Sequence, residues 1–108
     1  MFTKAIIATA LLTSLVAPLA ALADGEVEQR IDNQQYRINQ GVRNGSLTYG
    51  EYHRLDNGLD RIQGQRARDL RGNDGHLTPA EYRRLNREQN RLSDRIYFDK
   101  HNRAHQNP

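Results

Sequence analysis

Three stretches of the chain carry apolar residues at spacings of three and four, which is the periodicity of an amphipathic α-helix. Their members are Val27, Ile31, Ile38 and Val42, with Gln34 or Gln35 in the gap; then Tyr52, Leu55, Leu59 and Ile62; then Tyr82, Leu85, Leu92 and Ile96. The pattern predicts an all-α fold with helices at about 26–43, 49–71 and 79–103. The short connections favour an antiparallel arrangement of the three helices.

The apolar stripes are narrow and interrupted. Gln89 occupies an expected apolar position of the third stripe, and Arg66 takes the position that follows Ile62. Such seams resemble those of coiled coils, in which a polar residue sets the register at a cost in stability. Gly41, Gly58 and Gly64 lie inside the helical pattern, where each costs about 1 kcal/mol relative to Ala. Close approach of two backbones or a bent helix is expected there.

Two segments of the chain, residues 44–62 and 74–92, share the pattern G-x-L-T-x-x-E-Y-x-R-L. This repeat indicates a duplicated helix-start unit. In each copy a Thr stands at the N-cap and a Glu follows three residues later, so each copy predicts a capping box. The two pairs are Thr48 with Glu51 and Thr78 with Glu81.

The ends of the helices carry further signals. Gly45 and Gly75 are expected to end the preceding helices in a left-handed conformation, and Pro79 suits the first position of a helix. Ion pairs such as Arg84 with Glu88 and Arg95 with Asp99 are expected on exposed faces. The tail from about residue 102 is predicted to be disordered.

Residues 1–23 have the composition of a cleavable secretion signal. An apolar run over residues 5–20 follows a short, positively charged start, and Ala21 and Ala23 frame an A-x-A cleavage site before the polar Asp24. We therefore predict cleavage after Ala23. The signal is of the bacterial kind, so the predicted destination is the periplasm or the medium, and no membrane span is expected in the mature chain.

Residues 24–108 are predicted to form a single small domain with a thin core. Leu, Ile, Val and Phe supply only 14 of these 85 residues, so disorder is an alternative. The chain has no Cys, which excludes disulfide bonds. Of the 15 basic residues in this part, 14 are Arg, and Lys100 is the exception. Arg is suited to bidentate contacts with carboxylates and phosphates, although a GC-rich genome would produce the same bias.

The loop before the third helix partly resembles the second half of an EF-hand calcium loop. Gly75 takes the place of the glycine in the middle of an EF-hand loop, Asp74 stands directly before it, and Glu81 stands where the closing ligand belongs. Asp74 and Glu81 are therefore candidate calcium ligands. Leu70 and Gly72, however, stand where the first two oxygen ligands belong. Asp69 and Asn73 could supply oxygens only in an irregular loop. The capping box explains the same Glu without an ion.

His101 and His105 are candidate ligands for zinc, copper or nickel, because residues four apart share one face of a helix. Both also fit a plain surface role near the end of the chain. No resident cofactor is predicted, and calcium or a transition metal remains the alternative.

The sequence offers little for catalysis. Ser46 and Ser93 lack the context of an activated nucleophile, and the repeat-related Glu51 and Glu81 are assigned to capping. We therefore expect a protein without enzymatic activity.

Arginines recur along two of the predicted helices and could track an anionic surface or polymer. They are Arg54, Arg61 and Arg68 on the second helix, and Arg84, Arg87, Arg91 and Arg95 on the third. The aromatic residues free to stack on bases are too few to favour nucleic acid as the partner.

The repeated G-x-L-T-x-x-E-Y unit, together with the N-R-E-Q-N-R-L-S-D-R-I-Y segment at residues 86–97, resembles a group of small exported bacterial helical proteins of unknown function. The resemblance covers about residues 37–102. It implies export and a duplicated helical unit, and it supplies no catalytic or binding residues.

Three functions therefore remain open. The first is an exported interaction or structural module that pairs through its helices with itself or with another protein. The second is a metal-binding protein, and the third is a binder of anionic surfaces through its arginines.

Overall fold

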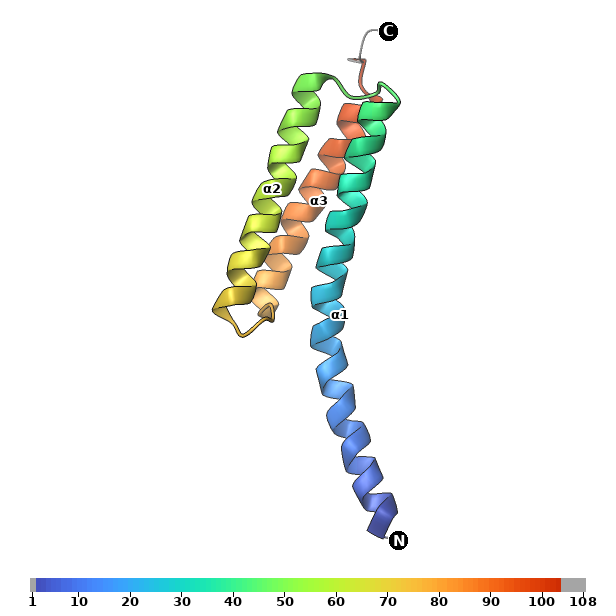
Figure 1. Ribbon diagram of the computed structural model, residues 1–108, viewed down its shortest axis with the longest axis vertical. Coiled ribbons are helices and arrows are strands. Elements are labelled where there is room, and N and C mark those ends of the chain that lie inside the picture. The colour runs from blue at the N-terminus through green and yellow to red at the C-terminus, as the bar shows by residue number, and fades with distance from the viewer. Residues whose placement is uncertain (1, 104–108) are drawn as a thin grey trace.

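The computed structural model describes the backbone of residues 2–103 and the side chains of residues 22–103. This part forms three helices: α1 (Phe2–Arg43), α2 (Tyr49–Gly72) and α3 (Pro79–His101). Each helix packs against the other two, and consecutive helices run in opposite directions (Figure 1). The expected all-α, antiparallel fold is confirmed. The predicted disorder of the tail concerns mainly residues beyond 103, which lie outside the described part.

The first helix begins much earlier than residue 26, where its apolar stripe begins. Its N-terminal part extends past the α2–α3 loop and away from the other helices (Figure 1). Among the described side chains, Val27 is the first buried one. The apolar stripe therefore predicts where α1 begins to pack against the other two helices, and not the residue at which the helix itself begins.

The core follows the three predicted stripes closely. Its buried apolar members are Val27, Ile31 and Ile38 of α1, Leu47 of the α1–α2 loop, Leu55, Leu59 and Ile62 of α2, and Leu85, Leu92 and Ile96 of α3. Tyr52 and Tyr82 are half-buried against this cluster. One stripe member is wrong: Val42 is 37% exposed, and Gly41 occupies the buried position instead.

Gly41 is buried because the α1–α2 loop packs directly on it. A Cβ at Gly41 would lie 2.6 Å from two side-chain atoms of Leu47, and the Leu47 amide donates a hydrogen bond to the Gly41 carbonyl at 3.0 Å. Leu47 is fully buried, whereas its repeat counterpart Leu77 is only half-buried. The missing side chain of Gly41 thus makes the site for Leu47.

A polar layer interrupts the core between α1 and α3. The buried amide of Gln34 donates to the Gln89 carbonyl at 2.7 Å and to the Ser93 hydroxyl at 2.9 Å. The amide of Gln89, also buried, donates to the Val27 carbonyl at 2.9 Å. These bonds can form at only one axial position of α1 against α3, so the two glutamines fix the register of the pair.

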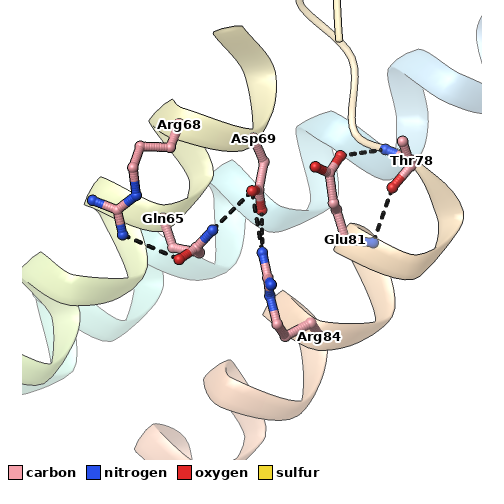
Figure 2. Close-up of polar contacts among 6 residues, drawn as sticks. All are labelled: Gln65, Arg68, Asp69, Thr78, Glu81 and Arg84. Carbon is pink, nitrogen blue, oxygen red and sulfur yellow. Dashed lines mark hydrogen bonds and ion pairs between the residues drawn. The ribbon is translucent and has the colours of Figure 1, made fainter. Parts of the chain in front are cut away.

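Both predicted capping boxes are present. The Thr48 hydroxyl accepts from the Glu51 amide at 3.2 Å, and the Glu51 carboxylate accepts from the Thr48 amide at 2.9 Å. Thr78 and Glu81 repeat this exchange at 3.1 and 2.9 Å (Figure 2). These bonds satisfy amides that a helix start leaves without intrahelical partners. They set the starting points of α2 and α3, and with them the positions of the arginines downstream.

The turns before the two helices contain left-handed residues, as expected. Gly45 has a φ of 77° and Gly75 a φ of 83°. Asp74, which was not expected to be left-handed, has a φ of 52°, a conformation that Asp adopts more readily than most non-glycine residues. The Gly75 amide donates to the Leu70 carbonyl at 2.8 Å, which closes the end of α2 in a Schellman-type turn.

Candidate functional site

A groove of about 800 Å³ runs between α2 and α3 and is lined by five of the ten arginines of these helices. It is lined by Arg54, Arg61 and Arg68 of α2 and by Arg91 and Arg95 of α3. The α2 arginines form a row one residue away from the buried stripe of Leu55 and Ile62, so their stems border the core while their guanidinium groups reach into solvent.

The floor of the groove is apolar and contains two glycines. Leu55, Ile62 and Leu92 line it but are almost fully buried, at 1%, 5% and 8% exposed, and Gly58 and Gly64 lie beside them. A Cβ at Gly58 would lie 3.3 Å from the Leu92 side chain, which places these two residues opposite each other across the helix pair. The Leu92 side chain thus fills the space beside Gly58, whereas a Cβ at Gly64 would meet only the Arg68 guanidinium, at 3.6 Å.

The groove has an excess of positive charge. Asp60 and Glu88 are its only acidic lining residues against five arginines. Within the described part of the chain, Arg54, Arg61 and Arg91 form no hydrogen bond or ion pair. Their guanidinium groups are therefore available to a carboxylate or phosphate.

The other two arginines of the groove are held by weak contacts. The Arg68 guanidinium donates to the Gln65 side chain at 3.1 Å, and Arg95 lies 3.5 Å from an Asp99 oxygen. Both side chains are exposed. The exposed contact of Arg68 contributes little, so an acidic ligand could replace it, whereas the Asp99 carboxylate that Arg95 faces is buried and would lose its ion pair.

Only part of the predicted α3 arginine row belongs to this groove. Arg84 turns toward α2 and pairs with both oxygens of Asp69, at 3.0 and 3.1 Å (Figure 2). Arg87 is exposed and does not line the groove. The expected exposed pair of Arg84 with Glu88 is therefore replaced by a contact between helices.

Asp69 has a structural environment, not that of a calcium ligand. It is 7% exposed, and besides Arg84 it accepts a hydrogen bond from the Gln65 amide at 2.8 Å (Figure 2). Asp74 lies exposed in the loop, and Glu81 is engaged in its capping box. The loop thus does not bring these three carboxylates together as a calcium site requires.

The predicted histidine pair lies only partly in the described region. His101 is exposed, stacks on the Tyr97 ring with centroids 4.0 Å apart, and contacts the Tyr97 carbonyl through Nδ1 at 2.6 Å. His105 lies outside the described residues. Among the described residues, no group of three or more His, Asp or Glu side chains is placed to hold a metal ion.

The residue after the predicted cleavage site docks onto the bundle. Asp24 accepts from the Leu77 amide at 3.2 Å and lies 3.1 Å from Nδ1 of His76 in the α2–α3 loop. Ala23 precedes it in α1, and nothing is described of the side chain of Ala21. Sequence reasoning treated Asp24 only as part of a processing site and did not anticipate this contact.

Two carboxylates meet at the other end of the bundle, and their pKa values shift in opposite directions. Burial acts to raise the pKa of Glu51, but hydrogen bonds from Thr48 and Asn102, together with the charge of Arg54, outweigh it and leave the pKa below 4.5. Burial raises the pKa of Asp99 above 3.8, opposed by Arg95 and assisted by Glu51. Asp99 is 1% exposed, so the expectation that it lies on an exposed face is wrong.

Comparison with models of known protein families, with curated proteins and with solved structures gives no match to this chain. Within the described residues, no helix combines the length and apolar character needed to cross a membrane.

Proposed function

We propose that the protein is an exported, non-enzymatic interaction module that binds an acidic partner in the groove between α2 and α3. The observation that carries this proposal is the excess of arginines along the groove, five against two acidic residues. Three of these arginines, Arg54, Arg61 and Arg91, have no hydrogen-bonding or ion-pair partner in the described part of the chain. Guanidinium groups bind carboxylates in bidentate geometry.

The chemistry of the groove supports binding more than catalysis. Its described lining consists of Arg, Gly, Leu, Ile, Gln and two acidic residues, with no Ser, Cys or His. Such a lining holds a ligand by charge and shape, and it contains no nucleophile next to a base.

Export is supported by the position of the predicted cleavage site relative to the bundle. Asp24 contacts the α2–α3 loop, and the N-terminal part of α1 extends away from α2 and α3 (Figure 1). A chain that begins at Asp24 keeps this contact and the buried stripe of α1, whose first described buried member is Val27. The test is expression of the full chain in a Gram-negative host, followed by fractionation and mass spectrometry. A periplasmic product that begins at Asp24 is expected, and a product retaining residue 1 contradicts export.

The binding proposal is tested with fluorescent poly-L-glutamate and two triple variants of equal charge. Arg54→Gln/Arg61→Gln/Arg91→Gln removes charge from the groove, and the control removes it from exposed arginines elsewhere, at Arg43, Arg83 and Arg87. We expect anisotropy titrations to show binding that weakens as salt approaches about 0.15 M, because the contacts are exposed. The groove variant should lose affinity and the control should retain it. Equal loss in both variants would show a general charge effect and contradict the proposal.

A further inference from the structure

The outer surface where α1 meets α2 carries a group of carboxylates. Two contacts set the axial register of these two helices, which run in opposite directions (Figure 1). Gln35 donates a hydrogen bond to Asp56 at 3.5 Å, and Arg66 lies 3.5 Å from a carboxylate oxygen of Glu28. The acidic side chains of this surface, called the acidic edge below, are Glu28, Asp32, Asp56 and Asp60.

The carboxylates of the acidic edge are available to a partner. Asp32 and Asp60 lie between the two contacts, one on each helix, and both are exposed. Neither forms a hydrogen bond or an ion pair within the part of the chain that the structure describes. The contacts of Asp56 and Glu28 are long, and the Glu28 side chain is 63% exposed, so a second cation could replace them at little cost.

The arginines of α1 and α2 are directed away from this edge. On α1, Arg30 and Arg37 both donate hydrogen bonds to residues of α3. On α2, Arg54, Arg61 and Arg68 lie along the α2–α3 groove. The bundle therefore separates its charges, with an acidic edge between α1 and α2 and a basic groove between α2 and α3.

The acidic edge and the groove match in their position along the bundle. The contacts that bound the edge lie at residues 56 and 66 of α2, about 15 Å apart, and the groove arginines of α2 extend from residue 54 to residue 68, about 21 Å. Asp60 stands on α2 between the two surfaces and borders both. Two copies placed side by side in the same orientation, without an axial shift, bring the edge of one against the groove of the other.

Resting on the proposed function, we infer that the acidic partner in the α2–α3 groove is a second copy of this chain, which presents its acidic edge. Carboxylates of one copy pair with Arg61 and Arg91 of the next. The two surfaces differ, so the contact is heterologous and joins copies into chains, since each copy keeps an unused edge or groove. Exposed ion pairs are individually weak, so the chains form at high protein concentration and dissociate as salt rises.

The test is sedimentation velocity of the purified protein from about 10 μM to about 1 mM, in about 0.02 M and about 0.5 M salt. Arg61→Glu/Arg91→Glu reverses the charge of the groove, and Asp32→Arg/Asp56→Arg reverses the charge of the edge. The matched control for the groove is Arg83→Glu/Arg87→Glu, which makes the same change of charge at two exposed arginines of α3 that do not line the groove. Circular dichroism checks that all variants remain helical.

We expect the sedimentation coefficient of the wild type to rise with concentration in low salt and to stay at the monomer value in high salt. Each reversed variant alone should stay monomeric, because its groove and its edge then carry the same sign of charge. An equimolar mixture of the two should associate again, since each variant offers the surface that the other has lost. The control variant should associate as the wild type does.

The other outcomes separate this inference from the proposed function. A wild type that stays monomeric at every concentration, yet binds poly-L-glutamate through its groove arginines, would overturn the second copy and leave an acid-binding groove. Association that the Arg83 and Arg87 control abolishes equally, or a mixture that stays monomeric, would overturn the pairing of these two surfaces. A monomeric wild type whose groove variant binds poly-L-glutamate as well as the wild type does would overturn both.

Discussion

Replacing Gly41 by Ala tests the packing that joins α1 to the α1–α2 loop. Helix propensity alone predicts that this change stabilises α1 by about 1 kcal/mol. The structure predicts the opposite sign, because the new Cβ would lie 2.6 Å from both Cγ and Cδ1 of Leu47 and 3.3 Å from the Lys100 side chain. These Leu47 atoms belong to a side chain that is fully buried.

The magnitude follows from the two ways of relieving this overlap. If Leu47 leaves its site, the protein loses about 1.5–3 kcal/mol of apolar burial. If Leu47 stays, the strain of overpacking costs about 1–3 kcal/mol. After the gain in helix propensity is subtracted, we expect the free energy of unfolding to fall by about 1 kcal/mol, and Tm to fall by about 4–8 °C for a domain of this size.

The assay is urea unfolding followed by circular dichroism at the helix band, with Gly64→Ala as the matched control. A Cβ at Gly64 makes only an ordinary contact, at 3.6 Å with the Arg68 guanidinium, so this variant should gain up to about 1 kcal/mol. If Gly41→Ala raises the unfolding midpoint as Gly64→Ala does, the reasoning about Leu47 is refuted.

Three further changes have expected outcomes. Arg84→Ala should lower the free energy of unfolding by about 1–3 kcal/mol, because it leaves the buried Asp69 carboxylate without the Arg84 nitrogen that donates to both of its oxygens. The exposed Arg83→Ala should stay within about 0.5 kcal/mol of wild type; equal effects in urea unfolding would contradict the role of the pair. Asp99→Asn should stabilise the protein more at pH 7 than near pH 4. The folded pKa of Asp99 is raised, so the folded state binds this proton more strongly than the unfolded state does, and stability is lost as the pH rises above 3.8 and the buried carboxyl group ionises. Thermal melts at a series of pH values that show no such difference would contradict this prediction. The double change Gln34→Leu/Gln89→Leu should raise the unfolding midpoint, because the side-chain carbonyl oxygens of both residues are buried without hydrogen-bond partners. It should also broaden the transition or change the elution volume in size-exclusion chromatography, because the register of α1 against α3 is lost. An unchanged or lower midpoint would show that the hydrogen bonds of the two amide groups outweigh the cost of burying these oxygens.

Much of the fold follows from local patterns. The three helices, both capping boxes and the left-handed glycines depend on residues within a few positions of one another, and all of them were predictable from the chain alone. Spacings of three and four likewise located most of the core, because they define the direction of a side chain about the axis of its own helix.

The groove was only half predictable for the same reason. The heptad row of Arg54, Arg61 and Arg68 is a property of one helix, and the sequence showed it. Which α3 arginines join that row depends on the rotation and register of α3 against α2. The structure settles this by placing Leu92 beside Gly58 and by directing Arg84 to Asp69.

The sequence by itself determined where the helices α2 and α3 start, where all three helices end within one or two residues, and which face of each is mainly apolar. Only the tertiary structure decided that Gly41 and not Val42 is buried, that Asp99 lies inside the bundle, and that Asp24 reaches the α2–α3 loop. The physical reason is that helix formation and capping arise from contacts close in the chain. Burial of a borderline residue, in contrast, depends on which side chain from a distant segment arrives against it.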